Sequence, residues 1–102
     1  MADELPDWRQ RGVYIRNRSR RKPGDTDIEP SWANEAYVDP DAVTFDPDYA
    51  SLSGRSVRTI GYSITAGFLI TVITLLDDGH LYGVNAWKSN STDAGYYEDT
   101  IS

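Results

Sequence analysis

The chain has no cysteine, and this absence is the first limit on what its 102 residues can do. Disulfide bonds and thiolate chemistry are excluded, and a zinc site would have to use the one histidine together with carboxylates. The chain starts without an apolar stretch, and its longest apolar run, Phe68–Leu76, is too short to cross a bilayer as a helix. We therefore expect a cytoplasmic protein with no metal, no cofactor and no membrane partner.

Sequence motifs for common chemistries are also missing. There is no glycine-rich nucleotide loop, no HExxH motif and no nucleophile elbow. His80 directly follows an Asp-Gly pair and is predicted to be solvated. Four aspartates lack the spacing of an EF-hand and are predicted to form turns and caps: Asp39, Asp41, Asp46 and Asp48.

Positive charge is scarce but concentrated. The formal net charge is −6, yet seven of the ten basic residues lie between Arg9 and Lys22, whereas acids are spread from Asp25 to Asp99. Salt limits the reach of each charge to roughly 8–10 Å, so a local basic stripe can bind a phosphate backbone even on an acidic protein. The alternative is a solvated, mobile surface segment. The predicted RNA-binding residues are Arg16, Arg18, Arg20, Arg21, Lys22 and Arg55.

The first half of the chain predicts one strand and one helix within a single domain. Residues 1–8 read as a flexible acidic tail, and residues 9–102 as the domain. Gly12–Arg16 alternates apolar and polar residues as a short strand does, and the tract that follows is a helical turn, a loop or partly disordered. A helix is predicted from Pro30 to about Val38, with Trp32, Ala33, Ala36 and Tyr37 on its apolar stripe. Residues 41–45 are predicted as a turn.

The second half of the chain predicts three strands in the stretches SVRTIGY, FLITVITLL and HLYGVNAWK. Asp78-Gly79 is typical of a type I′ hairpin turn, and a short helix is predicted from Ser91 or Thr92. Phe68–Leu76 is apolar on both faces and is predicted to be the central strand. The fold class is therefore α+β: a three-stranded antiparallel meander with one added N-terminal strand and helices packed on the sheet.

The predicted turns also give a strand register. It pairs Val72 with Asn85, Ile70 with Trp87, and Arg58 with Val72. A single bulge would change this assignment. The register places Lys88 on one face of the sheet, and the opposite face is predicted to carry Arg58, Tyr62, Phe68, Asn85 and Trp87.

Metal-free RNA cleavage needs few groups: a proton acceptor for the 2′-hydroxyl, cations beside the developing charge, and an acid at the leaving oxygen. Arg55, Arg58 and Lys88 lie on or beside the predicted strands, where a rigid backbone can aim them. Glu98 could accept a proton, and Tyr82, Tyr96 or Tyr97 could donate one. The alternative is that these cations are ordinary solvated strand residues and the tyrosines are edges of the core.

Residues 27–99 resemble the BrnT family of ribonuclease toxins, which have a RelE-like fold. The likeness is carried by DIEPSWANEAYVDP, by SGRSVRTIGYSITAGFLITVITLLDDGHLYG and by VNAWKSNSTDAGYYED. The resemblance implies a metal-independent endoribonuclease that inhibits translation, the toxin of a bacterial type II toxin–antitoxin pair, whose partners are RNA, free or on the ribosome, and a cognate antitoxin. It also implies a catalytic set of Arg58, Lys88, Tyr97 and Glu98.

Two alternatives to a catalytic toxin stay open. The first is a non-catalytic module of the same fold that binds protein or nucleic acid. The second is a toxin-fold protein that keeps its partner surface without cleaving RNA. The chain departs from the family pattern in its acidic net charge and in Asp93-Ala94-Gly95, where the family has basic residues in the final helix.

Overall fold

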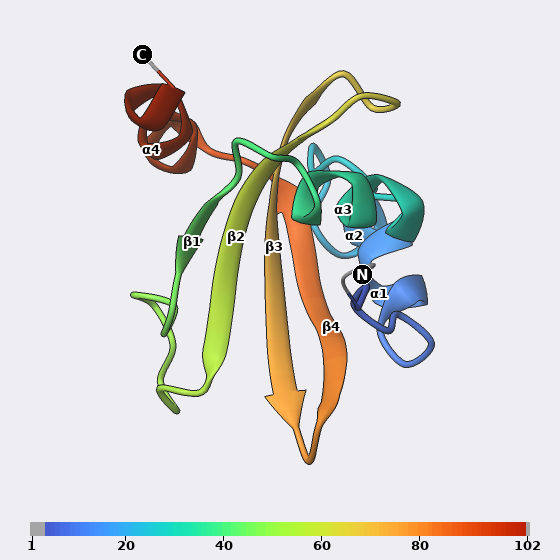
Figure 1. The fold of residues 1–102 in the computed structure, drawn as a ribbon. Coiled ribbons are helices and arrows are strands. Elements are labelled where there is room, and N and C mark those ends of the chain that lie inside the picture. The colour runs from blue at the N-terminus through green and yellow to red at the C-terminus, as the bar shows by residue number, and fades with distance from the viewer. Residues whose placement is uncertain (1–3, 102) are drawn as a thin grey trace.

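The computed structural model describes residues 4–101, which form an antiparallel sheet with helices on both faces (Figure 1). The strand order is β1-β2-β3-β4. In chain order the elements are α1 (Gly12–Arg16), α2 (Arg18–Arg21), α3 (Pro30–Tyr37), β1 (Val43–Phe45), β2 (Ser56–Ser63), β3 (Phe68–Asp77), β4 (His80–Lys88) and α4 (Ser91–Ile101).

The predicted meander is confirmed. β2, β3 and β4 pair in sequence order, and β3 lies between its two neighbours. Asp78 and Gly79 both have positive φ, 51° and 78°, which a type I′ turn requires at its two central positions. The second half of the chain therefore folds as its strand and turn signals predict.

The added strand is not where the sequence predicts it. Gly12–Arg16 is the helix α1, so the predicted N-terminal strand is wrong. Gly12 and Ile15, one helical turn apart, are buried, while Val13 is exposed. The fourth strand is β1, which lies in the segment predicted as a turn and pairs Val43 with Ile60 of β2.

Between β3 and β4 the predicted register holds next to the hairpin turn, from Asp77–His80 to Thr74–Gly83, and is one residue off only beyond it; between β2 and β3 it is one residue off throughout. Arg58 pairs with Ile73, and a bulge between Ile73 and Thr74 makes Ile73 pair with Asn85. The two differences cancel across the sheet, so Arg58, Asn85 and Trp87 share a face as predicted. Phe68 does not, because it pairs with Ser63 and lies on the face of Lys88, whose Nζ is 5.1 Å from its ring centroid.

One face of the sheet is covered by α3. Ala33 and Ala36 are fully buried, and a Cβ on Gly61 of β2 would lie 1.9 Å from the carbonyl oxygen of Ala36. Only glycine allows the helix to come this close to the strand. Trp32 is half-buried with its ring edge-on to Phe68. The core on this face also contains Trp8, Ile15, Ile28, Ile70, Val72 and Ala86.

Asp7 pairs with β4 and Trp8 is buried, although both lie in the predicted flexible tail. The Asp7 amide donates to the Leu81 carbonyl at 2.9 Å, and the Gly83 amide donates to the Asp7 carbonyl at 2.8 Å. Trp8 is buried, and its Nε1 donates to Asn34 Oδ1 at 2.9 Å. The domain therefore includes this segment. The rest of the predicted tail, residues 1–3, lies outside the described residues.

The outer edge of β4 is capped along its length. Beyond the pairing with Asp7, Arg11 Nε donates to the Val84 carbonyl at 3.1 Å. Further along, Arg18 Nη1 donates to the Ala86 carbonyl at 3.3 Å. The segment that carries most of the basic residues is thereby fixed to the edge of the sheet.

Candidate functional site

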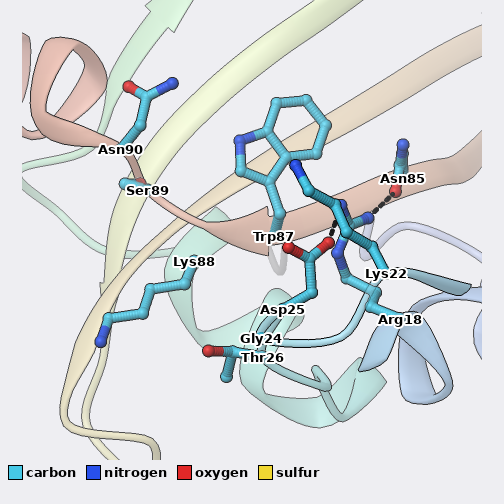
Figure 2. A pocket seen from close by; sticks show the side chains of 10 residues that line it. All are labelled: Arg18, Lys22, Gly24, Asp25, Thr26, Asn85, Trp87, Lys88, Ser89 and Asn90. Atoms are coloured by element: carbon cyan, nitrogen blue, oxygen red, sulfur yellow. Dashed lines mark hydrogen bonds and ion pairs between the residues drawn. The ribbon is translucent and has the colours of Figure 1, made fainter. Parts of the chain in front are cut away.

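A groove with a volume of about 540 Å³ opens where α2 meets the end of β4 (Figure 2). Its wall combines cations, an aromatic ring and amides from segments far apart in the sequence. Its lining residues include Arg18, Lys22, Asp25, Asn85, Trp87 and Lys88, and Asn90 directly before α4. We refer to this site as the β4 groove.

The side chain of Arg18 is held in the β4 groove by several contacts. Its Nη1 donates to Asn85 Oδ1 at 3.0 Å, and its Nη2 contacts Asp25 Oδ2 at 3.2 Å. The guanidinium carbon also lies 5.8 Å from the ring centroid of Trp87. These partners hold the arginine in one orientation, and Asp25 compensates its charge.

Lys22 and Lys88 are the free cations of the β4 groove. Both are exposed, and within residues 4–101 neither contacts a carboxylate. Lys22 extends over Arg18 toward the indole of Trp87, whereas Lys88 points away from that ring (Figure 2). The two ammonium groups therefore lie on different sides of the β4 edge, with the groove between them.

The other predicted RNA-binding residues are held elsewhere. Arg16 pairs with Glu29, and Arg21 stacks on Tyr14 at 3.6 Å while donating to its carbonyl. Arg20 is exposed on α2. Arg55 pairs with Asp77 beside the β3–β4 turn, at the end of the sheet opposite the β4 groove. The structure thus brings Arg18, Lys22 and Lys88 to one site and leaves Arg55 far from it.

Arg58 lies in a buried charge cluster under α4. Its Nε donates to Asp48 and its Nη1 to Asp93, each at 2.7 Å, and only 5% of the residue is exposed. Burial alone would lower the pKa of Arg58, but the hydrogen bond to Asp48 and the two carboxylate charges raise it. The alternative that Arg58 is an ordinary solvated strand residue is therefore wrong.

Asp93 completes this cluster as its anchor on α4. Fully buried, it accepts hydrogen bonds from the Tyr49 hydroxyl at 2.6 Å and from Thr71 Oγ1 at 2.8 Å. The hydrogen bond to Asp93, together with burial, raises the pKa of Tyr49 to about 12. Asp48 was predicted as a turn or cap residue, and its Oδ1 does accept from the Ala50 amide. The pairing of Asp48 and Asp93 with Arg58 was not predicted, since an aspartate in a loop or at a helix start has an ordinary capping role.

The predicted catalytic set does not form one group. By strand alternation Arg58 and Lys88 lie on opposite faces of the sheet. Tyr97 donates its hydroxyl to Asp39 at 2.6 Å, and burial together with this bond raises its pKa to about 12. Glu98 is exposed on α4. Each of the four side chains has its own surroundings, and only Lys88 lines the β4 groove.

The described residues also show which kinds of site are absent from them. Among residues 4–101, no group of three or more histidine, cysteine, aspartate or glutamate side chains is placed to hold a metal ion. The helices of this described part are too short or too polar to span a membrane. His80, predicted to be solvated, is 2.8 Å from Asp7 Oδ2 with 40% of its side chain exposed.

No family model, curated protein or solved structure matches this chain. The coarse fold class is nevertheless given by the structure, which is α+β with a four-stranded antiparallel sheet. Any function for the β4 groove has to be argued from its geometry and chemistry.

Proposed function

We propose that this protein binds single-stranded RNA in the β4 groove. One observation carries the proposal: Arg18 is fixed beside the half-buried ring of Trp87, and the uncompensated cations Lys22 and Lys88 lie at the rim. Proteins that bind single strands combine cations that follow the backbone with an aromatic side chain that bases can stack on. The β4 groove contains both components within one continuous surface.

Local charge makes such binding compatible with a net charge of −6. A phosphate within a Debye length of Lys22 and Lys88 responds to those charges far more than to acids elsewhere on the surface. Two exposed carboxylates, Asp77 and Asp78, lie at the other end of β4. The overall negative field slows the encounter with RNA, so we expect modest affinity that depends strongly on salt.

Fluorescence anisotropy of a labelled single-stranded RNA, measured over a range of salt concentrations, tests the proposal. The double variant Lys22→Gln/Lys88→Gln should weaken binding. It should also reduce the slope of log K against log salt by about 1.4, because each phosphate contact on a single strand contributes about 0.7.

A matched control removes the same amount of charge elsewhere. Arg9→Gln/Arg55→Gln also changes the net charge by two, and both of these side chains lie outside the β4 groove. We expect this control to stay within about twofold of the wild type. Equal effects of the two double variants would show that net charge, not the groove, controls binding. No binding at low salt would refute the proposal.

RNA cleavage and inhibition by an antitoxin stay predictions of the BrnT resemblance. The separation of Arg58 from Lys88 favours the non-catalytic module over the ribonuclease. Incubation of RNA with the protein in EDTA, with and without ribosomes, separates the two. Products that end in 2′,3′-cyclic phosphate would support the ribonuclease over the non-catalytic module. Growth arrest when the gene is induced without a neighbouring antitoxin gene would support the toxin.

A further inference from the structure

The cations of the β4 groove differ in whether a carboxylate compensates their charge, and this difference suggests which part of a ligand each position binds. The charge of Arg18 is compensated by Asp25 at 3.2 Å. The charges of Lys22, which reaches over Arg18, and of Lys88, which points the other way, are uncompensated within the described residues. A site for phosphate alone would need only such cations. Here the ring of Trp87 lines the same groove, so the groove suits a flat neutral group together with anions.

The ring of Trp87 is held in place by two arginines. The guanidinium carbons of Arg58 and Arg18 lie 5.3 Å and 5.8 Å from the centroid of the Trp87 ring. Each arginine is itself fixed by aspartates, so the indole is supported by rigid groups. The ring is only half-buried and lines the open groove. A pre-positioned aromatic surface binds a flat partner with little loss of entropy.

Two amides that line the same groove supply unused hydrogen-bond donors. Within residues 4–101, Asn85 uses its Oδ1 to accept from Arg18 and from the Ala86 amide. Asn90 uses its Oδ1 to accept from the Asp93 amide. Both Nδ2 groups therefore keep donors for a ligand. Unpaired bases present carbonyl oxygens and ring nitrogens that accept such bonds.

We propose that Trp87 is a stacking platform for one unpaired nucleobase, with Asn85 and Asn90 at the base edge and the adjacent phosphates at Lys22 and Lys88. This inference rests on the proposed function and adds to it a specific subsite. It distinguishes the β4 groove from a surface that attracts any polyanion, because a polyphosphate, or an acidic peptide without aromatic side chains, has no flat ring to stack. The ligand class is a single-stranded nucleic acid whose bases are free.

Comparison of two labelled oligonucleotides of equal length tests the subsite: a normal single-stranded RNA and an abasic one with the same number of phosphates. The wild type should bind the base-bearing strand roughly 5- to 100-fold more tightly, since stacking of one base on an aromatic side chain is worth that much. Trp87→Leu should bring the two affinities together and leave the salt slope unchanged. Trp87→Phe should restore part of the difference.

The matched control is Trp32→Leu, which removes the other half-buried indole, on the opposite face of the sheet beside Phe68. It should leave the preference for base-bearing RNA intact. Circular dichroism of each variant establishes that it is folded. If Trp87→Leu unfolds, Trp87→Phe and the NMR measurement below still decide the question.

The indole N–H resonance of Trp87 gives that second measurement on the unmodified chain. Base-bearing RNA should shift this resonance, while the Trp8 indole, which donates to Asn34 in the core, should stay in place. An unmoved Trp87 signal, or equal wild-type affinity for the base-bearing and abasic strands, would overturn the subsite and leave the RNA-binding proposal standing. Failure to bind either strand would refute both.

Discussion

Arg58 and Arg18 contact the same indole ring, Trp87, yet the structure gives them different surroundings. The side chain of Arg58 is 6% exposed and pairs with two aspartates, whereas that of Arg18 is 18% exposed and pairs with one. Arg58 joins three segments of the interior through its partners Asp48 and Asp93. Arg18 joins α2 to the β4 edge and borders open space. The comparison teaches that burial and the number of carboxylates, not the residue type, separate a structural arginine from one available to a ligand.

The strongest test of this difference is Arg58→Met. The substitution leaves Asp48 and Asp93 buried without their cation, so we expect a loss of about 3–5 kcal/mol in the free energy of unfolding. Urea denaturation at neutral pH measures it. A loss below about 1 kcal/mol would show that the buried cluster is not what holds α4 to the sheet.

A second test uses alkaline pH, because α4 is also held by the bond from Tyr97 to Asp39. Burial and this bond raise the pKa of Tyr97 from the ordinary tyrosine value of 10.0 to about 12, so its contribution is complete below pH 10 and is lost as the pH rises toward 12. Tyr97→Phe should make stability fall less over this range, by about 1–2 kcal/mol. Part of the alkaline loss should remain, since the pKa of Tyr49 is also raised to about 12. Identical pH profiles for the two proteins would contradict the assignment.

The smallest expected effect on stability is that of Arg18→Met. Its hydrogen bonds lie at a partly solvated edge where water can replace the guanidinium, so we expect a loss of about 1 kcal/mol. Its effect on RNA affinity should be larger than that of Arg58→Lys, which retains a buried cation. If Arg18→Met destabilised the protein as much as Arg58→Met does, the proposed difference between a structural and a ligand-accessible arginine would be wrong.

The parts of the fold that the sequence predicts have local causes. Asp78-Gly79 adopts the backbone its residues favour, and the three strands around it follow from their β-branched and aromatic content. Gly12–Arg16 shows the limit of such reasoning, because the apolar residues Val13 and Ile15 are spaced as on one face of a strand, whereas the buried positions are Gly12 and Ile15, one helical turn apart. Contact with β4 and α3 decides in favour of the helix, and no local signal carries that information.

Gly83 explains why the register was only partly predictable. A Cβ there would lie 2.4 Å from the Trp8 ring, and β4 has its bulge at this position, where Thr74 pairs with Gly83. A glycine inside a strand is a recognised sign of a bulge, so this signal was present in the sequence. The groove had no such signal. The sequence predicted that its cations bind RNA. It did not predict their place beside Trp87, which depends on the contacts of Arg18 with Asp25 and with the Ala86 carbonyl at the edge of β4.

The capped edge of β4 also bears on self-association. An uncovered strand edge is a template on which a strand of another molecule can pair, and this is a common start of aggregation and domain swapping. Here Asp7 occupies one stretch of the edge, and Arg11 and Arg18 occupy the carbonyls that follow. Chains shortened past Trp8 would lose the first of these caps together with the buried indole. Tags and cleavage sites placed close to Asp7 should therefore promote aggregation through the exposed edge of β4.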